Sequence, residues 1–304
     1  MSLGRRARIV DDVRRFFDSR GFLEVETPVV VPSPGLDVHL SAFEVVTAPG
    51  RPRRNLSTSP EYQMKRLIAA GHARTFQLTK AFRQDEQGSR HNPEFSILEW
   101  YRAPASVDEV MRDTEQLVAR VTGGRVALPG RTVDAAPPFA RMTVTEAFER
   151  YSGTPPDDTL AMAHADEDRF FRVLVEQVEP ALEALPYAVF LTEYPASQAS
   201  LARKKPGDDR VAERFELYVA GVELCNGFGE LTDPVEQRTR FMADQGARRA
   251  RGLPVYPLDE KLLDALAAGL PPCSGNALGI DRLVALACGT TDIGEVMAFT
   301  SEEL

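Results

Sequence analysis

The chain has 304 residues, of which 43% are hydrophobic and 27% charged, a composition typical of soluble globular proteins with one large domain or two small ones. Its net charge of −9 argues against broad, non-specific binding of nucleic acid, because neutralising phosphates requires a basic surface. The three cysteines form no C-x-x-C pair and the four histidines are scattered, which excludes the spacing typical of zinc sites. Because no signal peptide and no long apolar run is visible, we expect a cytoplasmic protein without a membrane span.

The first predicted unit is an amphipathic helix followed by a strand. Residues 5–20 carry apolar side chains at helical spacing, namely Ile9, Val13, Phe16 and Phe17. Gly21 is expected to end this helix, and residues 22–31 predict a strand. Pro28 lies inside that strand, which favours a sheet edge or a subunit boundary because proline cannot donate a hydrogen bond to a neighbouring strand.

Capping residues mark the next helices. Residues 56–67, LSTSPEYQMKRL, predict a strand that enters a helix at Ser59 and Pro60. The strings Ser106-x-x-Glu109 and Thr143-x-x-Glu146 are capping boxes, and the first predicts a helix to about residue 121.

A charged loop lies between two predicted strands. The stretch 82–101, FRQDEQGSRHNPEFSILEWY, has apolar flanks and a polar centre, which predicts a hairpin. Its polar part carries Arg83, Arg90 and His91, and guanidinium groups bind phosphate oxygens bidentately. A solvated hairpin whose charges satisfy one another explains the composition equally well, so both interpretations stay open.

Residues 123–190 are expected to form a helical insertion on a single domain. After a loop with several prolines, residues 166–179 predict a helix that breaks or kinks at Pro180. Residues 187–193 then predict a buried strand. This segment carries no chemistry that the sequence reveals.

Two glutamates flank a glycine-containing turn in residues 214–230. Glu223 and Glu230 could face one site, and Mg²⁺ is commonly held by one or two carboxylates together with phosphates. Two surface glutamates beside a turn are the plainer alternative.

Residues 273–286, CSGNALGIDRLVAL, predict a glycine-rich strand that leads into a helix. Gly275 and Gly279 allow the backbone to approach a planar ligand closely. Arg282 lies at the start of the helix, where its guanidinium and the backbone amides can share phosphate charge. An ordinary helix N-terminus would have the same pattern.

In this order, the strings resemble the three motifs of class II aminoacyl-tRNA synthetases, and specifically their lysine branch. Residues 22–31 resemble motif 1, residues 82–95 the motif 2 loop, and residues 273–286 motif 3. The resemblance implies an α+β fold, a mainly antiparallel sheet flanked by helices, as a single catalytic domain over residues 1–304. It also implies a homodimer formed through the motif 1 helix and strand. Because no anticodon-binding domain is recognisable before the string that resembles motif 1, we do not expect tRNA as a partner.

The resemblance also implies the roles of individual residues. Arg83 and Arg282 would grip the phosphates of ATP, and the motif 2 acid would be Asp85 or its neighbour Glu86, a choice that the sequence leaves open. Mg²⁺ would be held by Glu223 and Glu230. The remaining nucleotide contacts would be Arg90, His91, Asn92, Glu223, Leu224 and Gly279. The amino-acid pocket would be formed by Ser59, Pro60, Glu61, Glu99, Tyr101, Glu230 and Ala277.

Three details resemble the stand-alone paralogues of this branch, which attach (R)-β-lysine to a lysine side chain of elongation factor P. They are the string PASQASLA at residues 195–202, LEWYR at residues 98–102, and Ala277 in place of a motif 3 glycine. Arg90 is closer to the synthetase form. The implied activity is an ATP-dependent ligase with elongation factor P as acceptor. The alternatives are a truncated synthetase-like enzyme that adenylates α-lysine, and a silent paralogue that only binds lysine or ATP.

Overall fold

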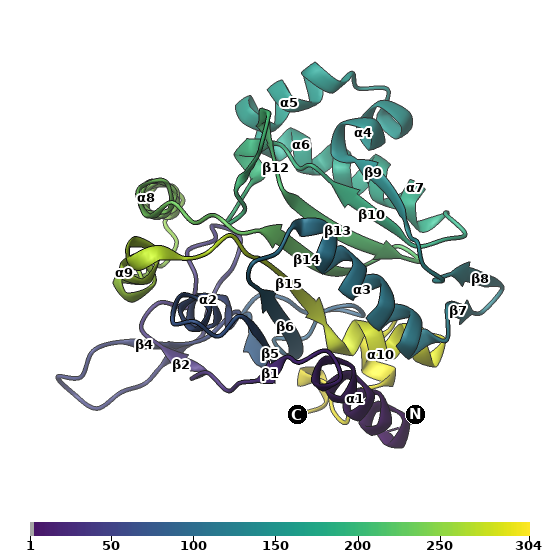
Figure 1. Ribbon diagram of the computed structural model, residues 1–304, viewed down its shortest axis with the longest axis horizontal. Coiled ribbons are helices and arrows are strands. Elements are labelled where there is room, and N and C mark those ends of the chain that lie inside the picture. The colour runs from purple at the N-terminus through teal and green to yellow at the C-terminus, as the bar shows by residue number, and fades with distance from the viewer. Residues whose placement is uncertain (1–2) are drawn as a thin grey trace.

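Residues 3–304, which the computed structural model describes, are arranged around one large sheet (Figure 1). The outer pairs β1–β5 and β10–β9 are parallel, and the other neighbouring pairs in this sheet are antiparallel. A mainly antiparallel sheet flanked by helices confirms the expected α+β class. In spatial order the strands are β1 (Leu23–Glu24), β5 (Arg74–Phe82), β6 (Glu94–Arg102), β15 (Ser274–Gly279), β14 (Val222–Gly229), β13 (Arg214–Val219), β10 (Val189–Thr192) and β9 (Ala140–Thr143).

The predicted hairpin is confirmed. Strands β5 and β6 pair without a break from Arg74↔Arg102 to Phe82↔Glu94. The polar residues 83–93 connect the two strands, and Arg83 directly follows the end of β5.

One face of the sheet is covered by α1 (Leu3–Asp18), α3 (Val107–Thr122) and α10 (Ile280–Cys288). The predicted apolar stripe of α1 is confirmed, since Ile9, Val13, Phe16 and Phe17 are all buried. Phe17 stacks on Phe76 of β5 and contacts Trp100 of β6, which attaches the helix to the sheet. The capping box at Ser106 is also present at the start of α3.

The other face is covered only in part. Helices α2 (Glu61–Ala69), α8 (Pro234–Ala250) and α9 (Glu260–Gly269) form an apolar cluster that includes Tyr62, Phe241 and Leu263 and that reaches Tyr101 of β6 (Figure 1). A second apolar cluster covers this face over β10 and β13, and the part left open between the two clusters is lined by many polar and charged side chains.

The prediction of a single strand over residues 22–31 is wrong. Only β1 lies in the main sheet, at its edge, and β2 (Val30–Val31) belongs to a small sheet with β4 (Arg54–Leu56) and β3 (Glu44–Val45). Pro28 lies between the two short strands, where its missing N–H interrupts no pairing. Gly21 ends α1 with φ +71°, as its lack of a Cβ permits.

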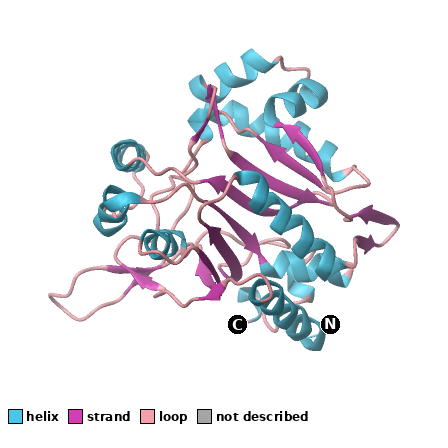
Figure 2. Cartoon of the chain, in the orientation of Figure 1, coloured by secondary structure: helices cyan, strands magenta, loops and turns pink. Residues whose placement is uncertain are grey.

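Residues 123–190 are not wholly helical. They supply β9, β10 and a hairpin of β7 (Arg125–Leu128) and β8 (Arg131–Asp134), besides the helices that gather beside β9 and β10 (Figure 2). The helix does not break at Pro180, since a π-helical turn, Leu174–Val178, leads directly into α7 (Glu179–Glu183), which has Pro180 in its first turn. A π-helical turn is an irregularity that often accompanies a kink, so the kink predicted as the alternative to a break stays a prediction. The other helices of this segment are α4 (Val144–Ser152), α5 (Pro156–Ala165) and α6 (Glu167–Val173).

The remaining elements are short. They are β11 (Lys204–Lys205), β12 (Asp208–Ala212) and the 3₁₀ turns Ala196–Gln198, Ile293–Glu295 and Ser301–Glu303. Among the helices of residues 3–304, none has the length and apolar character needed to cross a membrane.

Candidate active site

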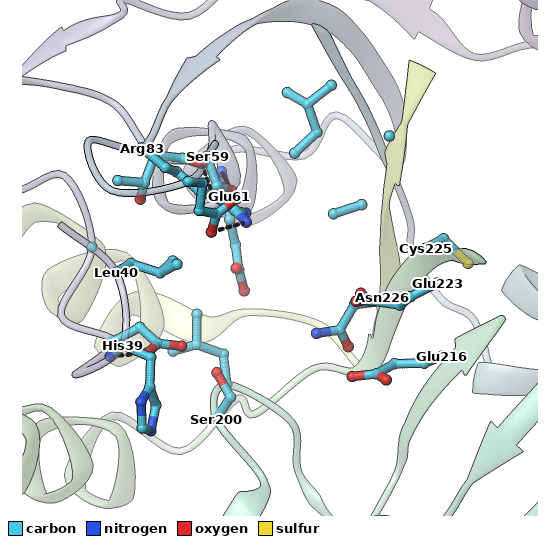
Figure 3. Close-up of a pocket in the computed structure, with 18 of the residues that line it drawn as sticks. His39, Leu40, Ser59, Glu61, Arg83, Ser200, Glu216, Glu223, Cys225 and Asn226 are labelled. Carbon is cyan, nitrogen blue, oxygen red and sulfur yellow. Dashed lines mark hydrogen bonds and ion pairs between the residues drawn. The ribbon is translucent and has the colours of Figure 1, made fainter. Parts of the chain in front are cut away.

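Four neighbouring strands present alternate side chains to the open face of the sheet. Successive residues of a strand point to opposite faces, and the register aligns Glu99 of β6 with Ala277 of β15, Ala277 with Asn226 of β14, and Asn226 with Glu216 of β13. This row of side chains lines a cavity of about 780 Å³ (Figure 3). The sheet therefore forms the floor of the candidate site.

A bulge in β14 turns Glu223 toward the same cavity. Leu217 pairs with Cys225 and the next residue, Tyr218, pairs with Glu223, so Leu224 is one extra residue in this strand. A bulge shifts the alternation by one position, which places Glu223 on the face of Asn226 despite their odd spacing. Figure 3 shows Glu216 and Glu223 on adjacent strands with their carboxylates pointing in the same direction.

Arg282 connects motif 3 to the loop of the hairpin. Its Nη1 donates to the backbone oxygen of Glu223 at 2.7 Å, and its Nη2 lies 2.7 Å from Nε2 of His91. Burial and the Arg282 charge lower the pKa of His91, so we infer a neutral imidazole that accepts from Arg282.

Two more arginines line the cavity at this end. Arg83 Nη1 lies 3.2 Å from Glu86 Oε1, and its guanidinium lies over the Phe95 ring at 5.0 Å. Arg90 Nη1 donates to the backbone oxygen of Gly221 at 2.8 Å. With Arg282, they form a cationic end of the cavity that suits a polyphosphate.

The structure favours one of the two motif 2 acids. Glu86 lines the cavity, whereas Asp85 is exposed and does not. Asn92 also lines the cavity, and its side chain bridges the loop to the C-terminal segment, accepting from the Ser301 amide at 2.9 Å.

Glu216 and Glu223 are the carboxylates that face this cationic end. Glu216 accepts from Arg214 Nη2 at 2.7 Å, whereas the Glu223 side chain is 42% exposed and lies 3.8 Å from Arg282. Within the cavity, partial loss of solvation and then the charge of the neighbouring Glu216 raise the pKa of Glu223. Two neighbouring carboxylates beside these arginines fit Mg²⁺, because a divalent cation would relieve their repulsion and take its other ligands from phosphates and water.

The part of the cavity around Ser59 is acidic. Glu99 is fully buried, and its two oxygens accept from Ser59 Oγ at 2.5 Å and Tyr101 Oη at 2.9 Å. Burial and then the nearby Glu61 raise the pKa of Glu99 to about 8. Glu61 lines the cavity beside Ser59, so this part offers anionic and hydroxyl groups to an ammonium.

Glu230 lies behind this pocket and does not meet Glu223. Its carboxylate is fully buried, 2.5 Å from Lys65 Nζ, which also contacts Glu61 at 2.6 Å. Burial disfavours the Lys65 ammonium, but Glu230 and Glu61 outweigh burial and raise its pKa above the usual range. Seven residues of extended chain, roughly 20 Å, separate Glu230 from Glu223. The sequence predicted that Glu223 and Glu230 hold Mg²⁺ together. The structure contradicts this for Glu230, which lies away from Glu223.

Of the other site residues expected from the sequence, some line the cavity and some lie behind the residues that line it. Ala277, Gly279 and Leu224 line it. Pro60 is the N-cap residue of α2, and Tyr101 lies behind Glu99, so neither reaches the cavity directly.

Sequence reasoning missed several residues of the site. Arg214, Glu216 and Asn226 line the cavity, and Lys65 compensates part of its acidic charge. Glu216 could have been found by pairing the two strands of residues 214–230 across the turn at Ala220 and Gly221. The helical segment also contributes, because Glu167, Asp168 and Phe171 of α6 lie at the cavity.

Residues 2–303 match the protein family described as tRNA synthetases class II (D, K and N). The chain belongs to this family. Among curated proteins, the elongation factor P--(R)-beta-lysine ligases of Salmonella paratyphi A, Salmonella dublin and Salmonella enteritidis PT4 are similar to it. Each is 43% identical over an alignment of 320 positions, which covers 98% of this chain and 94% of the relative. In class II terms, the motif 2 loop is the β5–β6 connection, and motif 3 is β15 with α10.

Proposed function

We propose that the protein is an ATP-dependent ligase that activates (R)-β-lysine as an aminoacyl-adenylate and transfers it to a lysine side chain of elongation factor P. The observation that carries this proposal is a single cavity lined both by the guanidinium groups of Arg83, Arg90 and Arg282 and by the carboxylates of Glu61 and Glu99. Such a cavity can hold the phosphates of ATP and the ammonium groups of a diamino acid at the same time. The names of the Salmonella relatives, similar over nearly their whole length, support the same activity.

The reaction requires positioning and charge stabilisation. A carboxylate oxygen of the amino acid attacks the α-phosphorus of ATP, the bond to pyrophosphate breaks, and an acyl-adenylate forms. The acceptor amine then attacks the acyl carbon, releasing AMP and a proton. Arg83 and Arg282 would stabilise charge on the phosphates, and Arg90 and His91 would hold the phosphate tail from the motif 2 loop.

Glu216 and Glu223 would hold Mg²⁺ beside these phosphates. When bound, the ion neutralises phosphate charge and helps to orient the triphosphate.

Gly279 and Asn92 would border the nucleotide, because both line the cavity near Arg282. A Cβ on Gly279 would meet nothing closer than Arg282 Cδ at 3.4 Å. The glycine therefore leaves room for a ligand and is not required by packing.

Ala277 would select the position of the substrate's amino group. It lies between Glu99 and Asn226 in the sheet, and its methyl group occupies space at the cavity floor. That methyl would crowd an amino group on the α-carbon and leave room for one on the β-carbon. Glu61 and Glu99 would supply negative charge for the ammonium groups from the cavity wall, and Glu230, paired with Lys65, would add to it from behind the pocket.

The partners are proposed on similar grounds. Elongation factor P would be the acceptor and tRNA would not. A homodimer would form through α1 and the β1–β2 segment, which is supported by the exposed apolar side chains of Leu3, Leu23 and Val30. We propose a cytoplasmic location.

ATP–pyrophosphate exchange with the purified protein tests the activity. We expect strong exchange with (R)-β-lysine and weak exchange with α-lysine, followed by transfer of the labelled acyl group to elongation factor P. Preference for α-lysine would point to a lysine-adenylating enzyme with another acceptor. No exchange with either amino acid would leave only a silent, ligand-binding paralogue.

A further inference from the structure

Glu216 is held by three side chains. Its Oε1 accepts from Arg214, and its Oε2 accepts from Tyr194 Oη at 2.5 Å and from Tyr218 Oη at 2.9 Å. The Glu216 side chain is only 8% exposed. A buried carboxylate with three donors has one defined orientation, because leaving any donor unpaired in the interior is costly.

Two of the side chains that donate to Glu216, Tyr194 and Tyr218, belong to the apolar core of the helical segment formed by α4–α7. The rings of Tyr194 and Tyr218 are buried in an apolar cluster formed with α4–α7, which includes Phe170, Leu174 and Val178. Their hydroxyls leave this cluster and meet at Glu216. Packing of the helical segment against β10 and β13 therefore fixes where both hydroxyls lie.

The segment makes two further contacts with the same network. Glu179 Oε1 of α7 lies 3.3 Å from the Tyr218 hydroxyl, whose single proton is donated to Glu216. Arg214 lies over the Tyr194 ring at 4.4 Å and donates to the backbone oxygen of Gln198, whose amide in turn contacts Glu167 of α6 at 3.2 Å. A chain of direct contacts thus connects α6 and α7 to the carboxylate at the cavity.

We propose that Tyr194 and Tyr218 are positioning residues, which anchor Glu216 to the helical segment so that it faces Glu223 in the geometry a divalent cation needs. This gives residues 144–183 a role in the site. The inference rests on the magnesium site within the proposed function, and not on the identity of the amino acid. Side chains that orient metal-binding residues commonly change metal affinity about 10- to 100-fold when they are removed.

Direct metal binding tests the proposal. Free Mn²⁺ is measured by electron paramagnetic resonance in the presence of full-length protein and a non-hydrolysable ATP analogue, without amino acid. For Tyr218→Phe we expect a Kd for Mn²⁺ about 10-fold higher than that of the wild type, and a similar change for Tyr194→Phe. The KM for (R)-β-lysine in the exchange assay, at saturating Mg²⁺, is expected to stay within about twofold.

The matched control is Tyr256→Phe. Tyr256 is also buried and its hydroxyl accepts one hydrogen bond, from the Ala42 amide at 2.9 Å, but it has no contact with Glu216. We expect its Mn²⁺ affinity to be that of the wild type. If Tyr218→Phe behaves like this control, or if its amino-acid KM rises as much as its metal Kd, the proposal is overturned. If the wild-type protein shows no exchange activity but Tyr218→Phe still binds Mn²⁺ more weakly, the proposed reaction is refuted and the positioning role of the tyrosines is supported.

Discussion

Substituting Gly275 with alanine tests how closely the acidic pocket is packed. A Cβ at this position would lie 2.3 Å from Cδ1 and Cε1 of the Tyr101 ring and 2.8 Å from Glu230 Oε1. Gly275 and Tyr101 are direct neighbours in the sheet, and Tyr101 is only 3% exposed. The ring therefore has to move, because atoms at this distance overlap.

The size of the effect follows from these distances. Ordinary carbon contacts require roughly 3.5 Å, so the ring has to shift by about 1 Å. The Tyr101 Oη–Glu99 Oε2 hydrogen bond is 2.9 Å long, and the same shift would break it. Overpacking of this kind lowers the free energy of unfolding by about 1–3 kcal/mol. Loss of the hydrogen bond to Glu99 should raise the KM for the diamino acid about 10-fold.

Urea unfolding and ATP–pyrophosphate exchange measure the two effects. Gly246→Ala is the matched control, because Gly246 lies inside α8 and its added Cβ would meet no atom within 4 Å. This control should gain about 0.5–1 kcal/mol, since alanine favours a helix over glycine. If Gly275→Ala is as stable as the wild type and its KM is unchanged, the close approach of Tyr101 and its role in holding Glu99 are refuted.

Three further outcomes are expected. Arg282→Ala should abolish ATP–pyrophosphate exchange, since it removes a phosphate ligand and the partner of His91; unchanged exchange would contradict the site assignment. Glu216→Gln should raise the Mg²⁺ concentration for half-maximal exchange about 10-fold, which a magnesium titration measures, and an unaltered requirement would exclude this carboxylate. Because the pKa of Glu99 is raised to about 8 and a bound ammonium needs its anion, kcat/KM for the diamino acid should rise with pH from about 6 to 8, by up to about tenfold per unit. Glu99→Gln should flatten this profile, and a wild-type profile that falls over the same range would show the sign to be wrong.

Local signals in the sequence identified the elements that carry the site. The amphipathic stripe of α1, the capping box at Ser106 and the β5–β6 hairpin each depend on residues a few positions apart, and each is confirmed. The order of the motif strings was sufficient to recognise the class II family. Such features are readable because their physical cause, helical periodicity or a turn, lies within the segment itself.

The interruptions of these elements were less predictable. One strand was expected over residues 22–31, and a break or kink at Pro180; the continuous strand and the break are not observed. Both expectations concern proline, whose cost depends on whether the tertiary structure needs its missing N–H at that place. The chain around Pro28 leaves one sheet for another, and Pro180 lies in the first turn of a helix.

Only the tertiary structure decided which carboxylates lie together. Glu223 and Glu230 share a strand and a turn in the sequence, yet the bulge at Leu224 and the β13–β14 register place Glu223 beside Glu216. Glu230 instead pairs with Lys65, a residue from a helix more than one hundred positions earlier. Composition and spacing in the sequence could identify acidic residues that are candidates for the site. Which of them meet depends on strand register and packing, because a shift of one residue along a strand moves every following side chain to the other face of the sheet.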